Sequence, residues 1–121
     1  MIAGNYNILC EQGTTFTRVI ALEQPTIEDP TVYEPYPLTG HTARMQVRRT
    51  IESTSVIIEL TTENGRISID EEDGIITLSI NDSDTSEITS SGVYDLEIID
   101  DSGNVSRVIQ GSFTLSNEVT R

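Results

Sequence analysis

The sequence predicts an all-β fold: an immunoglobulin-like antiparallel β-sandwich of about eight strands with one short helical crossover. Composition is the first observation, because Ile and Val number 16 and 8 against 7 Leu and 3 Ala, and β-branched residues favour strands. The second is residues 90–99, where Tyr94, Leu96 and Ile98 share one face, the pattern of a half-buried strand. The third is a series of turn signals at short intervals, without hydrophobic repeats of helical period. The length of 121 residues predicts one domain, residues 1–121.

Tyr94 stands near the start of its predicted strand, two residues after Gly92. This spacing suits a tyrosine corner, in which a tyrosine of a late sandwich strand hydrogen-bonds back to the preceding loop. An ordinary strand with a half-buried tyrosine is the alternative.

The first two strands are predicted at residues 6–10 and 14–22, separated by a break at Gln12-Gly13. The inward face of the second strand is ambiguous, because Phe16 and Ile20 share a parity with Arg18, while Val19 has the other. A β-bulge would reconcile the two patterns.

Residues 24–39 form an acidic loop that holds all four prolines of the chain. Proline cannot donate to a β-ladder, so we expect a loop here and not a central strand. The segment is longer than most connections in compact domains, which makes it a candidate contact surface. A variable, solvated loop is the alternative.

The middle of the chain predicts a third strand at residues 43–48 with a basic outer face, and a fourth at residues 56–60. Asn64-Gly65 predicts a tight hairpin into a strand at residues 67–69, because both residues accept a positive φ. Asp73-Gly74 predicts the next turn, into residues 76–80.

Residues 81–88 interrupt the β pattern and predict one helical turn, capped by Asp82 or Ser83, that crosses between the two sheets. After the Tyr94 strand, a turn at residues 101–104 leads into a last strand at residues 105–115, with a kink expected at Gly111. Residues 117–121 form a polar tail.

Charge excludes several partners. The net charge is −13 and arginine supplies all seven basic residues, so nucleic acid and anionic membranes are not expected to bind. The flat guanidinium fork of arginine suits ion pairs at interfaces. Cys10 is the lone cysteine and is expected to be a small buried hydrophobe, in a protein made in a reducing cytoplasm. No apolar run is long enough for a membrane span.

No catalytic constellation is found, so the chain is not expected to be an enzyme, and no cofactor is expected. A Cys-His pair would need the fold to join Cys10 and His41, which their spacing does not support, and zinc would need more nitrogen and sulfur ligands. Residues 70–74 and 81–84 are rich in oxygen donors but lack the spacing of an EF-hand. Solvated turns explain them better than a calcium site.

The arginines of the third strand suggest a surface role. If this strand neighbours the Tyr94 strand, Arg44 and Arg48 face outward beside Asp95 and Glu97. We expect cross-strand ion pairs there, each worth about 0.2–1 kcal/mol. The same face is alternatively a docking surface for another subunit.

Several stretches resemble a family of small tailed-bacteriophage virion proteins and the N-terminal domain of phage baseplate upper proteins. The resemblance is carried by YNILCEQGTTF, LTGHTARMQVRR, ELTTENGRISIDEEDGIITLSI, SGVYDLEIIDDSGNVSRVIQGSFTLS and the terminal VTR. It covers nearly the whole chain apart from the Pro-rich loop. Baseplate upper proteins continue into fibre-like segments, and the absence of such a segment here favours an adaptor or connecting role over receptor binding.

The resemblance implies a non-enzymatic assembly protein, present in several copies in the tail or baseplate of a phage particle. It would bind other virion proteins and copies of itself; capsid decoration or a neck position is the alternative within the particle. A carbohydrate-binding module with Tyr33 and Tyr36 as its platform is the rival from another class, and a host-directed inhibitor is a third. The residues expected at a protein interface are Tyr33, Tyr36, Arg44, Arg48, Asp95, Glu97 and Arg121.

Overall fold

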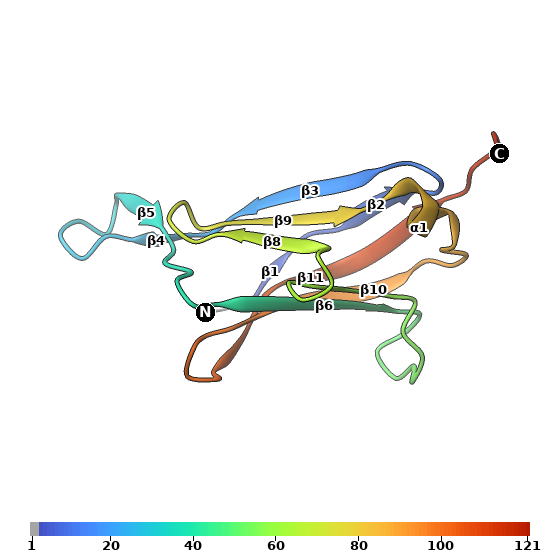
Figure 1. The fold of residues 1–121 in the computed structure, drawn as a ribbon. Coiled ribbons are helices and arrows are strands. Elements are labelled where there is room, and N and C mark those ends of the chain that lie inside the picture. Colours follow the sequence, from blue (N-terminus) through green and yellow to red (C-terminus); the bar gives the residue numbers. More distant parts are fainter. Residues whose placement is uncertain (1–2) are drawn as a thin grey trace.

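The structure is a computed structural model that describes residues 3–121, and it is built almost entirely from strands (Figure 1). Strands hold 50% of the residues and helix 4%, so the all-β prediction is confirmed. Two sheets face each other in a sandwich-like arrangement, and a small two-stranded ribbon extends beyond one end of them (Figure 1). Among the described residues, no helix is long and apolar enough to cross a membrane.

The larger sheet has six strands in the order β1-β11-β10-β6-β7, with β2 also paired to β11. Its central strands carry the longest alternating stretches of the sequence, which is why they lie in the middle of the sheet. The bounds are Gly4–Asn5 for β1, Ile8–Glu11 for β2, Thr42–Arg48 for β6, Ile58–Thr61 for β7, Gly92–Ile99 for β10 and Val105–Ser116 for β11.

The smaller sheet has three antiparallel strands in the order β3-β9-β8, and the ribbon pairs β4 with β5. The ribbon corrects the prediction of a plain loop at residues 24–39: its strands hold Pro25 and Pro35, which a two-stranded ribbon tolerates. The bounds are Phe16–Ala21 for β3, Glu23–Pro25 for β4, Tyr33–Pro35 for β5, Ile67–Asp70 for β8 and Ile75–Ile80 for β9.

The core lies between the two sheets and is aliphatic. Tyr94, Leu96 and Ile98 of β10 are all buried, as their alternation predicts. Leu78 of β9 and Phe16 of β3 belong to the same cluster of buried side chains. Cys10 is fully buried there, as expected for a small hydrophobe, and burial raises the pKa of its thiol.

The edge formed by the first strands departs from the antiparallel prediction. Both β1 and β2 pair with β11 in the parallel sense, with Gly4 opposite Ile109 and Ile8 opposite Phe113. Tyr94 does not form a tyrosine corner: its hydroxyl donates to the backbone carbonyl of Tyr6, 88 positions away, and not to the loop before β10. The hydroxyl therefore ties the first strands to the sheet.

Gly111 makes that contact possible. It is the β11 partner of Tyr94, and a Cβ placed on it would lie only 2.4 Å from the Tyr6 carbonyl oxygen.

The strand irregularity predicted at Gly111 lies elsewhere: the register of β10 and β11 shifts between Leu96 and Glu97, opposite Val108. The bulge predicted in residues 14–22 is wrong, because β3 pairs with β9 without a break from Phe16 to Ala21.

Asn64-Gly65 does not form the predicted hairpin. Strands β7 and β8 belong to different sheets, so the segment between them is a corner of the sandwich. The side chain of Asn64 accepts from the backbone N–H groups of Thr61 and Arg66, and only Gly65 has a positive φ, of 81°. This side-chain turn replaces the hairpin, which would need positive φ at both residues.

The helical crossover is confirmed. Helix α1, Asp82–Ser86, connects β9 of the smaller sheet to β10 of the larger one. Its N-cap is Asn81, one residue before the predicted caps, and the Asn81 side chain accepts from the backbone N–H of Asp84.

Candidate interaction surfaces

The outer face of the larger sheet brings together the charged residues predicted on it. Strand β6 pairs with β10 in antiparallel register, with Arg44 directly opposite Glu97. Arg44 Nε donates to Glu97 Oε1 at 2.8 Å, the ion pair expected from the sequence. Because Arg44 is exposed, this pair contributes only about 0.2–1 kcal/mol to stability.

The second predicted ion pair is not formed. Arg48 lies opposite Val93, and its guanidinium donates to Gln46 Oε1 and to the backbone carbonyl of Ser53. Asp95 instead lies 3.5 Å from Arg107 Nε of β11. Each expected residue is on the expected face, but Arg48 and Asp95 have other partners than each other.

A shallow depression of about 600 Å³ lies over β6, β10 and β11 on this face. Its lining includes Arg48, Asp95, Glu97 and Arg107, and Gln110 accepts from the Arg107 guanidinium. Positive and negative groups alternate, so the depression suits neither a polyanion nor a strong cation. Ile51 and Val93 also line the depression, so its surface is of mixed polar and apolar character.

The ribbon β4–β5 carries exposed apolar side chains. Ile27 is 98% exposed at its tip, and Val32 and Tyr33 are also exposed; these three residues form the ribbon patch. Four carboxylates lie in the same segment, and arginine is absent from it: Glu23, Glu28, Asp29 and Glu34. Because apolar groups of this size are usually covered, the ribbon patch is a candidate contact site.

The base of the ribbon is held rigidly to the smaller sheet. Leu22 donates its N–H to the Gly74 carbonyl, and its own carbonyl accepts from the Tyr36 N–H. A Cβ on Gly74 would lie 2.8 Å from each of the carbonyl oxygens of Leu22 and Tyr36, so the close approach requires glycine.

Tyr33 and Tyr36 do not form a shared aromatic platform. Tyr33 is exposed in β5, whereas Tyr36 packs against the hydrophobic core. A flat sugar-binding surface made by both rings is therefore absent, and the expectation of such a platform is corrected.

The connection from β6 to β7 carries a second exposed apolar group. Ile51 is 84% exposed and Val56 is also exposed; with Arg48 and Arg49 they form the loop patch. Among the ion pairs of residues 3–121, the arginine partners are Arg44, Arg66 and Arg107. The loop patch therefore holds two guanidinium groups that no carboxylate neutralises at short range, beside one acidic residue, Glu52.

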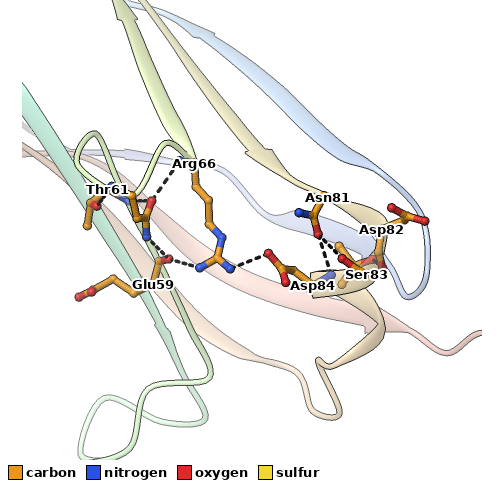
Figure 2. Close-up of polar contacts among 9 residues, drawn as sticks. Glu59, Thr61, Arg66, Asn81, Asp82, Ser83 and Asp84 are labelled. Carbon is orange, nitrogen blue, oxygen red and sulfur yellow. Dashed lines mark hydrogen bonds and ion pairs between the residues drawn. The ribbon is translucent and has the colours of Figure 1, made fainter.

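The oxygen-rich segments have structural contacts. In Figure 2, Arg66 lies between the Glu59 backbone and Asp84 of α1: it donates to the Glu59 carbonyl at 2.9 Å and to Asp84 Oδ2 at 2.7 Å. Asp70 accepts from the backbone N–H of Asp73 in the turn before β9. Within residues 3–121, no group of three or more His, Cys, Asp and Glu side chains is placed to hold a metal ion.

The remaining predicted residues lie apart from these surfaces. His41 precedes β6, with its Nδ1 3.1 Å from the Thr39 carbonyl oxygen, while Cys10 is buried in β2. Arg121 donates to the Glu118 carbonyl in the tail.

Sequence reasoning missed several residues of these surfaces, Ile27, Ile51 and Arg107 among them. Ile27 and Ile51 are isolated apolar residues in polar connections, a signal that could have been followed. Arg107 could not be placed, because the unpaired residue Val108 at the register shift reverses the faces of the β11 residues that precede it, Arg107 among them.

No protein-family model matches the chain, and a search of curated proteins finds no significant match.

Proposed function

We propose that this chain is a non-enzymatic structural protein of a tailed-bacteriophage particle, a multi-copy tail or baseplate component that docks neighbouring virion proteins. Its localisation is then the virion, after synthesis in the host cytoplasm. The resemblance of several stretches to small virion proteins supports this role. Capsid decoration or a neck position is the alternative within the particle.

The ribbon patch is the observation that carries the proposal. Ile27, Val32 and Tyr33 stand on an extension beyond the two sheets, while the base of that extension is fixed by Gly74. A rigid extension with apolar groups suits docking to a neighbouring subunit, because little conformational entropy is lost when it binds.

The proposal includes an immunoglobulin-like sandwich as the scaffold. The order β11-β10-β6-β7 corresponds to strands G-F-C-C′ of that fold, and β3-β9-β8 corresponds to B-E-D. The crossing of α1 from β9 to β10 fits the connection of strand E to strand F. The parallel pairing of β1 and β2 with β11 adds an edge to this arrangement.

Mass spectrometry of purified particles tests the role. Particles from a lysate that contains this chain should retain it through a density gradient, in several copies, and antibody labelling should place it at the tail. A chain that is abundant in the lysate but absent from gradient-purified particles would reject the proposal. Labelling on the head would select the capsid alternative.

A further inference from the structure

Two surface patches carry opposite charge, and each contains one of the two most exposed isoleucines among the described residues. The ribbon patch presents Ile27, and the loop patch presents Ile51, both almost free of contacts. Residues 23–35 of the ribbon carry four carboxylates and no arginine, whereas residues 48–56 carry two arginines and one glutamate. The patches are therefore complementary in charge and alike in hydrophobicity.

The charges of both patches persist at neutral pH. Hydrogen bonds from the Thr31 hydroxyl and backbone N–H hold the pKa of Asp29, near Ile27, below its usual value. In the loop, Arg48 is held by neutral acceptors, Gln46 and the Ser53 carbonyl, so its charge is not cancelled. Arg49 is exposed and belongs to none of the ion pairs among residues 3–121, so a partner carboxylate can approach it.

The two patches lie at opposite ends of β6. The ribbon enters the sheets on the side where β6 begins at Thr42, and the loop patch follows the end of β6 at Arg48 (Figure 1). Seven residues of strand span roughly 20 Å, so the patches cannot meet within one copy. A contact between them joins different copies and is heterologous.

From these observations we infer that the chain associates head to tail with a second copy of itself, the ribbon patch of one copy seated on the loop patch of the next. Ile27 contacts Ile51, and the ribbon carboxylates approach the arginines of the loop patch. This inference rests on the proposed assembly role and names the partner of the ribbon. A repeated heterologous contact builds a ring if the rotation closes and a filament if it does not.

Two complementary variants test the contact. Ile27→Glu removes the ribbon half and leaves the loop half intact; Ile51→Glu does the reverse. By sedimentation velocity across a concentration series, the unchanged chain should form species larger than a dimer. Each variant alone should associate about tenfold more weakly or worse, because a carboxylate replaces a buried apolar group. A mixture of the two should form a one-to-one dimer and nothing larger, since one intact contact remains.

Val119→Glu is the matched control, because Val119 is equally exposed in the tail, outside both patches. It should associate like the unchanged chain, and far-ultraviolet circular dichroism should show all three variants to be folded. A monomeric unchanged chain, self-association that survives either variant, no dimer in the mixture, or loss of association in Val119→Glu would each overturn the inference. A monomeric chain that is present in purified particles rejects the head-to-tail contact while leaving the proposed function standing.

Discussion

Tyr94 of β10 and Gly111 of β11 are partners in the larger sheet, and Tyr6 lies beside them in the break between β1 and β2. The Tyr94 ring reaches past Gly111, where a side chain would collide with the Tyr6 carbonyl, and its hydroxyl donates to that carbonyl. Asn7 adds a second tie, because its side chain accepts from the backbone N–H of Ser112. These two hydrogen bonds attach the segment between β1 and β2 to β10 and β11.

Tyr94→Phe should lower the free energy of unfolding by about 1–3 kcal/mol, because the variant leaves the Tyr6 carbonyl without its donor. Urea denaturation followed by fluorescence or circular dichroism measures the change. Tyr33→Phe is the control, since Tyr33 is exposed and should shift the midpoint very little. Equal effects of the two variants would contradict the assigned role.

The same hydroxyl makes stability depend on alkaline pH. Burial raises the pKa of Tyr94 well above its usual value of 10.0, so the ionised form is favoured in the unfolded chain. The contribution of Tyr94 is fully present below about pH 10 and is lost as the pH rises toward the folded-state pKa. The stability gap between the unchanged chain and Tyr94→Phe should therefore narrow above pH 10; a gap that stays constant would contradict this.

At the scale of elements, alternation in the sequence predicts β6, β9 and β10 well, because each buries one face and the side-chain period of a strand is two. The ribbon strands β4 and β5 could not be predicted, since three-residue strands with proline carry no period. The ion pair of Arg44 and Glu97 could be foreseen from strand adjacency. The partners of Arg48 could not, because one of them, the Ser53 carbonyl, depends on the conformation of the connection between β6 and β7.

The corner at Asn64 shows why a turn motif alone misassigns topology. Asn-Gly predicts a local reversal, but whether the chain pairs with the strand it has left or enters the other sheet depends on burial elsewhere. Here Ile67 and Ile69 of β8 pair with β9 of the smaller sheet. The Asn64 side chain then bonds the edge of β7, donating to the Glu59 carbonyl.

Asn64→Ala should destabilise the fold by about 1–2 kcal/mol, the loss expected for a capping side chain with several backbone partners. Thermal or urea unfolding measures it. Asn117→Ala, in the exposed segment after β11, is the matched control and should be near neutral. If Asn64→Ala were equally neutral, the corner would be maintained by Gly65 and packing alone.

At the scale of the whole molecule, charge is unevenly distributed. The outer face of the larger sheet pairs or neutralises most of its charges, so the excess behind the net charge of −13 lies on the ribbon, the turns and α1. Repulsion among these carboxylates opposes the compact state.

Added sodium chloride should therefore raise the melting temperature, by a few degrees between about 0.01 M and 0.3 M, because the screening length falls from about 30 Å to below 10 Å. Scanning calorimetry measures the shift, and an equal osmolarity of an uncharged solute is the control. A melting temperature that falls with salt would mean that the surface ion pairs outweigh the repulsion.

The pairing of the first strands with β11 sets the order of events during synthesis. Asn7 is synthesised well before its hydrogen-bond partner Ser112, which lies 105 positions later in the chain. Until β11 emerges, the apolar side chains of β2, Ile8 and Cys10, have no neighbouring strand to cover them. Folding of the larger sheet is therefore completed only after β11 has been synthesised, and until then the nascent chain is a natural client for chaperones that shield unpaired strands.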